Sequence, residues 1–390
     1  MRTSWTEITD FTDKEYEVTI GSIGLRDDPF PIQAPSTVDY WADNEELFEK
    51  LRSTLVDAMI FPTSNIYIFY GDVGVGKTFA ARLMCHPSGL NLFFGELPEG
   101  MIKDQYVFII DAVVPRRSGE LTSTAYRNII EEMLEEIRQD PDLREFFIDN
   151  LSVLPSGDVN LSFQRIGQAF RQKTLGGTDY DLSSNEGFKF VTGKKNKIGR
   201  ITDINQISKI IRYLFFVVLQ KYDRINLVID ECENLSEAPL SDRYQFSDLI
   251  KTLYTDIPNK MNVFLVYTQD TYSEIEKTLQ RALLDRIKDT IEFKPVTSHE
   301  DLIIYIRECI QKRGKIDYRE LITDEVLDQF SRYLISKYGR ISFRDVNKEM
   351  HMLISKCYQF KMDSAKDDKF PFKIDEAAYS FYKTIFNIRG

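Results

Sequence analysis

One eight-residue stretch, GDVGVGKT from Gly71 to Thr78, limits the folds open to this chain more than any other feature. It follows the apolar and aromatic run NIYIFY (Asn65 to Tyr70), which predicts a buried strand, and it precedes TFAARLM (Thr78 to Met84), which predicts a helix. The pattern G-x-x-x-x-G-K-[ST] in that context indicates a phosphate-binding loop. Its glycines let backbone N–H groups turn inward around an anion, and the helix adds its positive end.

The loop therefore predicts binding of a nucleoside triphosphate, with ATP and Mg²⁺ as the expected cofactors. Lys77 would reach the β- and γ-phosphates, and the Thr78 hydroxyl would ligate Mg²⁺. The residues expected to bind the nucleotide are the loop and its next neighbour: Gly71, Asp72, Val73, Gly74, Val75, Gly76, Lys77, Thr78 and Phe79.

A second motif, NLVIDECENL, places two carboxylates after an apolar run. Asp230 and Glu231 would lie at the carboxyl end of the predicted strand Ile225 to Asp230, the edge at which open α/β sheets bind ligands. We expect Asp230 to hold Mg²⁺ directly or through water. We expect Glu231 to orient and activate the attacking water.

A polar residue also follows the next predicted strand, Asn262 to Tyr267. Thr268 is the first candidate for reading the γ-phosphate and positioning the water, and Gln269 is the second. An ordinary turn residue remains the alternative reading of both.

Two arginines are candidates for contacts with the γ-phosphate. Arg286, just before the predicted strand Thr290 to Phe293, could reach the nucleotide of a neighbouring subunit, with Arg281 as its competitor. Arg344, early in a later helix, could close over the phosphates, with Arg340 as its competitor. Surface ion pairs are the alternative for these arginines.

Strands alternating with helical patterns predict an α/β fold with a doubly wound, mostly parallel sheet. The remaining strand is expected at Tyr106 to Val114, and a small helical lid domain is expected after Pro295. The helices are expected at Glu45 to Met59, Thr122 to Arg138 and about 203–222, 243–255, 271–287, 299–313, 323–338 and 343–360. The predicted organisation is a lead-in at 1–45, a core at 46–296 with an insertion at about 140–202, a lid at 297–360 and a tail at 361–390.

Composition narrows the class of protein. The formal net charge of -11 argues against a basic nucleic-acid coat, although local basic patches stay open. The start of the chain has no apolar signal segment, and the longest apolar run, Ile210 to Leu219, is too short to span a bilayer. Four scattered cysteines without CxxC spacing indicate neither a zinc site nor a disulfide framework. A cytoplasmic protein with no membrane partner is the simple expectation.

At these residues the sequence resembles an AAA+ ATPase, and more narrowly the clade of origin-recognition and initiator ATPases with their bacterial relatives. The segments that carry the resemblance are GDVGVGKT (71–78), VIDE (228–231), LLDRIKDTIEFKPVT (283–297), SFRDV (342–346), the lead-in DDPF (27–30) with ADNEELFEKL (42–51), and 108–134. The resemblance implies a P-loop sheet sandwiched by helices, a lead-in folded over the adenine, and an arginine that acts in trans. Initiators usually end in a winged-helix domain, for which about 30 residues after the helical domain are too few, so we do not expect DNA binding by that route.

Three functions remain open from the sequence. The favoured one is an ATP-hydrolysing switch, with ATP between the sheet and the helical domain, in a self-assembling multiprotein complex. The second is a slow nucleotide-dependent assembly switch that recruits a partner protein. The third is a DNA-loading or transposition-regulator ATPase that grips DNA through GKKNKIGR (193–200) and Arg116-Arg117, stretches that are more often solvated loops.

Overall fold

The structure is a computed structural model. The residues that it describes are 20, 22–32, 40–42, 44–60, 63–85, 87–94, 105–111, 129–130, 133–135, 137–150, 211, 214–215, 217–219, 222, 224–256, 260–269, 271–364 and 372–388. Most of the predicted insertion, both basic stretches considered for DNA binding and most of the helix predicted at Thr122 to Arg138 lie outside these residues.

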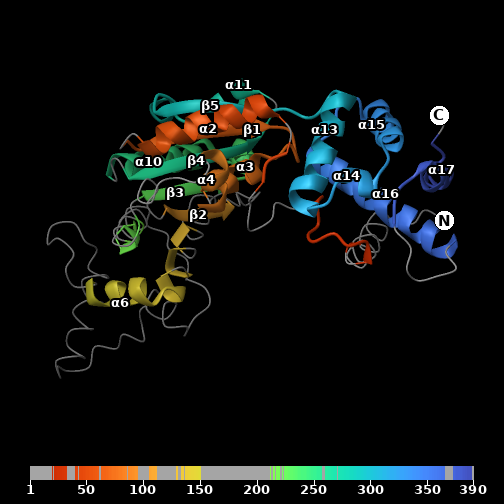
Figure 1. Ribbon diagram of the computed structural model, residues 1–390. Helices are drawn as coiled ribbons and strands as arrows, with labels where there is room; N and C mark the ends of the chain where they lie inside the picture. The colour runs from red at the N-terminus through yellow and green to blue at the C-terminus, as the bar shows by residue number, and fades with distance from the viewer. Residues whose placement is uncertain are drawn as a thin grey trace, which may run out of the picture. The chain divides into compact units, whose positions relative to one another are not determined.

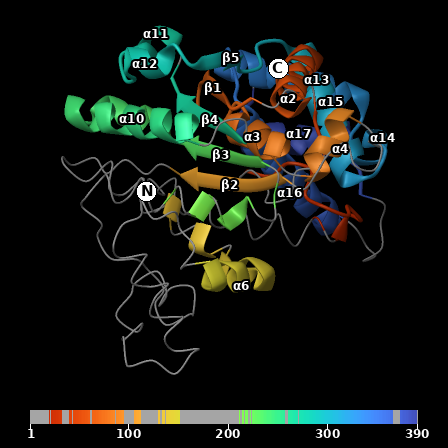
Figure 2. The ribbon, with the colours of Figure 1, turned by 90° about the vertical axis from the view of Figure 1, so that its left-hand side faces the viewer.

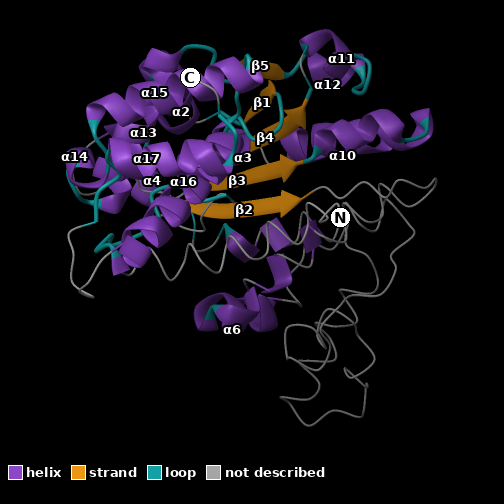
Figure 3. Cartoon of the chain, turned by 90° about the vertical axis from the view of Figure 1, so that its right-hand side faces the viewer, coloured by secondary structure: helices purple, strands orange, loops and turns teal. Residues whose placement is uncertain are grey.

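A five-stranded parallel sheet forms the centre of the α/β part, with strand order β2-β3-β4-β1-β5. Figures 1 and 2 show the strands, and the arrows in Figure 3 run in one direction. The strands are β1 (Asn65–Gly71), β2 (Gln105–Asp111), β3 (Arg224–Asp230), β4 (Met261–Thr268) and β5 (Ile287–Phe293). The three inner strands are buried along almost their whole length, as expected when helices cover both faces of a parallel sheet. This architecture confirms the predicted fold class.

Three asparagines form a row across the amino-terminal ends of the inner strands. Asn65 Nδ2 donates to Asn262 Oδ1 at 3.3 Å, and Asn262 Nδ2 donates to Asn226 Oδ1 at 2.9 Å. All three are buried, and each is the register partner of its neighbour in the sheet. Because an unpaired buried amide is costly, this row favours one alignment of β3, β4 and β1.

The segment before β5 corrects one prediction. The sequence pattern predicts a single helix over about 271–287, but the structure has two short helices, α11 (Tyr272–Glu276) and α12 (Arg281–Leu284). Polar side chains compete with the helical hydrogen bonds at the break: the Thr278 hydroxyl donates to the Ile275 carbonyl at 2.8 Å, and Ser247 Oγ accepts from the Gln280 N–H at 3.1 Å. β5 consequently begins at Ile287, three residues earlier than predicted.

The chain divides into two compact units, each with its own core. One contains residues 52–71 and 81–292, including β1 to β4. It contains residues 52–60 of α2 (Glu45–Ile60) and residues 81–85 of α3 (Lys77–Cys85). Its complete helices are α4 (Pro87–Phe94), α6 (Pro141–Asn150), the 3-10 helix η2 (Cys232–Glu237), α10 (Leu240–Asp256), α11 and α12. The helix predicted at Glu45 to Met59 is therefore confirmed, whereas α4 was not predicted. The predicted domain boundaries stay a prediction.

The other unit contains residues 1–51, 72–80 and 293–390, so the phosphate-binding loop clusters with it. Its C-terminal helices are drawn in blue in Figure 1. They are α13 (His299–Cys309), continued by the π-helix η3 (Ile310–Gly314), α14 (Tyr318–Leu321), α15 (Asp324–Tyr338), α16 (Phe343–Ser364) and α17 (Glu376–Ile385). Their apolar faces meet in one core, which also contains Phe30 and Tyr40 of the lead-in.

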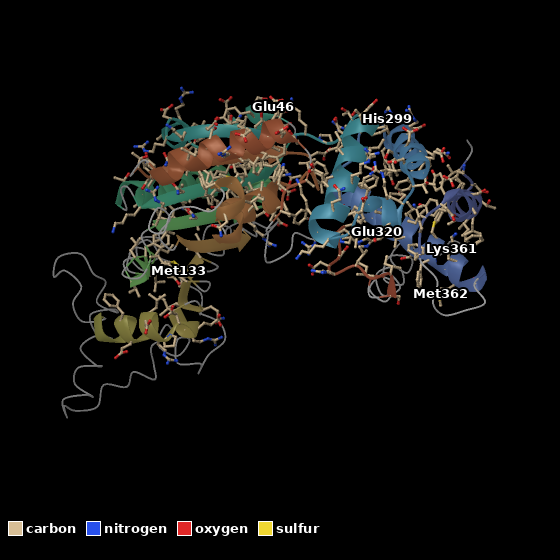
Figure 4. The ribbon with its side chains drawn as sticks, viewed as in Figure 1. Glu46, Met133, His299, Glu320, Lys361 and Met362 are labelled. Atoms are coloured by element: carbon tan, nitrogen blue, oxygen red, sulfur yellow. The ribbon has the colours of Figure 1, made fainter. Side chains whose placement is uncertain are left out.

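Helix α17 shows that the aromatic-rich tail is part of the helical core. The Asp375 carboxylate caps the helix by accepting from the Ala378 N–H at 3.0 Å, and it also accepts from Lys361 Nζ at 2.6 Å. Lys361 lies near the end of α16 (Figure 4). Tyr379 and Tyr382 are buried, each with its ring edge-on to Phe330. The capping aspartate followed by an amphipathic pattern is the sequence signal for this helix.

None of the helices that the structure describes combines the length and the apolar character that crossing a membrane requires.

Candidate nucleotide-binding site

The phosphate-binding loop begins where β1 ends, at Gly71, and it runs into α3, which begins at Lys77. Gly74 has φ 74° and Gly76 has φ 94°, a backbone region that residues with a Cβ rarely adopt. These two glycines let the loop turn tightly just before the helix begins. The loop thus has the local structure that the sequence predicts, followed by a helix of nine residues.

Lys77 folds back over this loop. Its side chain is buried, with 5% of the residue exposed, and Nζ donates to the Asp72 carbonyl oxygen at 2.6 Å. A buried ammonium group needs such a partner, because burial of an unpaired charge is costly. The ammonium group therefore lies at the mouth of a glycine turn, which is the arrangement that binds phosphate oxygens.

The start of α16 packs directly against the same loop. The Arg344 N–H donates to the Gly74 carbonyl oxygen at 3.2 Å. A Cβ added to Gly74 would lie 2.8 Å from Arg344 Cβ and 2.9 Å from Ser342 Oγ. Arg340 Nη2 lies 3.7 Å from Asp72 Oδ2. Arg344 thus contacts the loop through its backbone N–H, and Arg340 contacts it through an exposed ion pair.

The lead-in segment contacts Phe79, the residue that follows Thr78 of the loop. The Tyr40 ring lies edge-on to Phe79 at 5.4 Å between ring centroids, and the Trp41 ring lies 6.3 Å from it. Helix α16 binds the backbone of the lead-in, because Asn347 Nδ2 donates to the Pro31 carbonyl at 2.7 Å and His351 Nε2 is hydrogen-bonded to the Phe30 carbonyl at 2.7 Å. Aromatic rings therefore surround Phe79 on the lead-in side.

The acidic pair lies at the carboxyl end of β3, as the sequence predicts. Asp230 ends the strand, and Glu231 adopts the left-handed conformation with φ 55° and ψ 32°. The Asp230 carboxylate accepts from the Glu231 N–H at 2.9 Å, and Asn234 Nδ2 donates to Glu231 Oε2 at 3.4 Å. A residue other than glycine in this region is strained and is often found at functional sites.

Glu233 connects this turn to the tip of β4. Its Oε2 accepts from the Thr268 N–H at 2.9 Å, so the first candidate for reading the γ-phosphate is fixed through its backbone. Between the acidic residues, Cys232 is fully buried, and burial raises the pKa of its thiol. The neutral thiol serves as part of the core. The role of Glu233 was not predicted, because its partner lies 35 positions away in the sequence.

Gln269, the second candidate at this tip, pairs with the first residue of the phosphate-binding loop. It forms an antiparallel bridge with Gly71, which is also the register partner of Thr268 in the sheet. Its Oε1 is buried and accepts no hydrogen bond from the part of the chain that the structure describes. The strand tips of β1 and β4 therefore meet at the edge where the loop begins.

The two arginines near β5 have local partners. Arg286, in the turn between α12 and β5, donates from Nη1 to the Ala282 carbonyl. Arg281 Nε lies 2.9 Å from Asp285 Oδ1, and its side chain is 83% exposed. The Arg286 side chain is thus turned back onto α12, whereas Arg281 extends along the surface.

The oxygen ligands available for Mg²⁺ fit its coordination habit. Among the described residues, no three His, Cys, Asp or Glu side chains form a metal-binding group. Mg²⁺ needs no such group, because it keeps several waters and is bound through one or two protein oxygens together with substrate phosphates. The Thr78 hydroxyl and the Asp230 carboxylate are ligands of that kind.

No protein-family model matches the sequence, and no curated protein matches it. Solved structures do match. The ORC2 protein of Aeropyrum pernix in its ADP form is similar with a TM-score of 0.50 and 12% identity, over 93% of this chain and 73% of that one. The ORC1 protein of the same organism in complex with DNA gives a TM-score of 0.48, 13% identity and coverage of 93% and 70%.

Domain III of the replication initiation protein DnaA from Thermotoga maritima gives a TM-score of 0.40 and 13% identity, over 91% of this chain and 98% of that one. At the level of fold, this chain is therefore similar to the ORC2 protein, which agrees with the resemblance predicted from the sequence.

Proposed function

We propose that this chain is a Mg²⁺-dependent ATPase that converts ATP and water to ADP and phosphate and acts as a nucleotide-driven switch in a multiprotein assembly. The observation that carries the proposal is the loop itself, with Gly74 and Gly76 at positive φ and the buried ammonium group of Lys77 over the turn. The ADP form of the similar ORC2 protein supports a nucleotide as the ligand.

Within the loop, the backbone N–H groups and Lys77 would bind the β- and γ-phosphates, and Thr78 with Asp230 would hold Mg²⁺. Lys77 would exchange its bond to the Asp72 carbonyl for one to a phosphate oxygen. Bound Mg²⁺ supplies charge neutralisation on the phosphates. Tyr40, Trp41 and Phe79 offer an aromatic surface for the base.

At the end of β3, Glu231 would accept a proton from the attacking water. The left-handed backbone and the bond from Asn234 fix the direction of the carboxylate before substrate arrives. Thr268, fixed by Glu233, would orient the water from the neighbouring strand. Preorganised groups of this kind lower the barrier because they need little rearrangement during the reaction.

Slow basal turnover, the second candidate function, is favoured by one observation. The guanidinium group of Arg286 donates to the Ala282 carbonyl in α12, so it must change partners before it can reach a neighbouring subunit's nucleotide. A chain of this design hydrolyses ATP slowly alone and faster when it self-assembles or meets its protein partner. Arg344 would contribute to the same phosphate from the helical unit.

The test measures phosphate release from wild type at rising protein concentration, with and without DNA. Lys77→Ala, which lacks the charge for the phosphates, gives the background. We expect specific activity to rise with concentration. We also expect a mixture of Arg286→Ala and Lys77→Ala to regain activity that neither has alone, because one supplies an intact pocket and the other an intact arginine. Phosphate release equal to the Lys77→Ala background under every condition would contradict the proposal. A dependence on DNA would favour the DNA-loading alternative.

A further inference from the structure

The start of α16 contacts the phosphate-binding loop through the loop's own backbone. We infer that Ser342 and Arg344, at the start of α16, position this loop, so that the loop and the helical lid are coupled even before a nucleotide is bound. The inference rests on the proposed function only for what the loop binds. The contact itself is a feature of residues 72–80 and 342–346 within one compact unit.

Gly74 is the point of closest approach. An added Cβ at this position would lie under 3.0 Å from Arg344 Cβ and from Ser342 Oγ, closer than such contacts occur in proteins. Gly76 adds a looser contact, 3.8 Å from the Phe343 ring. Gly74 therefore serves two purposes: its positive φ turns the loop, and its missing side chain admits the helix end.

The helix end depends on the loop in return. The first N–H groups of a helix have no partner within the helix. Ser342 Oγ caps α16 by accepting from the Asp345 N–H at 3.2 Å, and it donates to Asp345 Oδ2 at 2.7 Å. The N–H of Arg344 is instead bound by the Gly74 carbonyl oxygen. Displacement of the loop would leave this N–H without its partner, so loop and helix stabilise each other.

Asp72 extends the coupling to the phosphate-binding lysine. Its carbonyl oxygen accepts from Lys77 Nζ at 2.6 Å, and its carboxylate faces Arg340, two residues before Ser342. A phosphate that binds Lys77 competes with the Asp72 carbonyl and so acts on a residue that is also paired with Arg340. Suppose that nucleotide binding shifts an equilibrium between two arrangements of the start of α16. By linkage, a change that shifts this equilibrium must then also alter the affinity for the nucleotide.

The first experiment measures amide hydrogen exchange in the nucleotide-free full chain, in a peptide covering the first turn of α16. Gly74→Ala is the test variant, and Gly339→Ala is its control. Gly339 has nearly the same φ, 69°, but nothing lies within 4 Å of its added Cβ. We expect Gly74→Ala to speed exchange of this turn about two- to tenfold, the effect of losing one hydrogen bond. Gly339→Ala should leave it unchanged. Equal exchange in Gly74→Ala and wild type would overturn the inference.

A second variant pair tests whether the close contact is the cause. In the Arg344→Gly background the nearest atom to the added methyl is gone, so Gly74→Ala should change exchange less than it does in wild type. In the Arg344→Ala background the Cβ remains, so the full effect should persist. An identical effect of Gly74→Ala in both backgrounds would contradict a steric contact with Arg344.

Nucleotide binding is measured separately with a fluorescent ATP analogue. Arg344→Gly should bind the analogue at least twofold more weakly than Arg344→Ala, because only the glycine variant loses the Cβ that lies beside Gly74. Lys77→Ala should abolish tight binding yet retain exchange protection at the start of α16. If wild type bound no nucleotide while Gly74→Ala still altered exchange, the proposed function would fail and the coupling would stand. Equal affinity of the two Arg344 variants would show that the contact does not position the loop.

Discussion

The phosphate-binding loop and the acidic turn, residues 230–234, both follow a buried strand of one parallel sheet. Both contain residues with positive φ, but the residue types that adopt it differ. In the loop, positive φ falls on glycines, Gly74 and Gly76, for which that conformation costs little. In the turn, it falls on Glu231, for which the left-handed region costs about 1–2 kcal/mol.

The difference follows from what each region has to present. In the proposed function, phosphate is bound by backbone N–H groups, so the loop can dispense with a side chain at Gly74, where the start of α16 takes up the space. In the proposed function, water activation needs a carboxylate, and the turn has a glutamate in a left-handed conformation supported by Asp230 and Asn234. Changes in the loop should therefore alter affinity, and changes in the turn should alter rate.

The largest effect is expected from Glu231→Gln. The amide has the shape of the carboxylate but cannot accept the proton, so hydrolysis should slow by about 10²–10⁴-fold while ATP stays bound. Single-turnover phosphate release and equilibrium binding of a fluorescent analogue measure the two quantities. Asp230→Asn is the matched control, and it should weaken the Mg²⁺ dependence of binding instead. Identical behaviour of the two variants would remove the division of roles.

The next effect is expected from Lys77→Ala in the loop. Loss of a charge-assisted contact worth about 1.5–3 kcal/mol should weaken ATP affinity about ten- to a hundredfold. Lys348→Ala, which removes the same charge from an exposed site on α16, should leave affinity unchanged. Isothermal titration with ATP and Mg²⁺ provides the measurement. A folded Lys77→Ala protein with wild-type affinity would show that the loop does not bind phosphate.

A smaller effect is expected where the turn is tied to β4. Glu233→Ala would leave the Thr268 N–H without its acceptor, and the protein should lose about 1 kcal/mol of stability. Glu233→Gln retains an oxygen acceptor and should lose less. Chemical denaturation of both variants compares them. Equal losses would indicate that the negative charge, rather than the hydrogen bond, supports the strand tip.

The smallest effect concerns strain in the turn. Glu231→Gly relieves the left-handed conformation but adds freedom to the unfolded chain, so we expect a net gain of about 0–1 kcal/mol in stability, with loss of turnover. Lys315→Gly is the matched control, because Lys315 has φ 57° against 55° for Glu231. It should change stability similarly and leave turnover intact. Destabilisation by Glu231→Gly alone would mean that the carboxylate holds the turn together.

Most local features were predictable from the sequence, although helix α4 was not, and the contacts between distant segments were not. The strands and the loop follow from short apolar runs and from glycine spacing, which depend on neighbouring residues. The break between α11 and α12 depends on Ser247 and Thr278, whose partners the helical pattern does not reveal. The left-handed Glu231, the bond from Glu233 to Thr268 and the contact of α16 with Gly74 arise from packing between distant segments.

The asparagine row at the opposite end of the strands affects how this protein can change during evolution. A strand that paired one residue out of step would separate a buried amide from its neighbour, at about 1–3 kcal/mol, and turn its side chains to the wrong face. Misaligned sheets are therefore disfavoured while the chain folds. The apolar residues between Asn226 and Asp230, and between Asn262 and Thr268, are free to exchange among similar side chains. Such drift leaves unchanged the number of residues from the row to the carboxyl ends of β3 and β4, so the positions of Asp230 and Thr268 in the sheet persist while the sequence diverges.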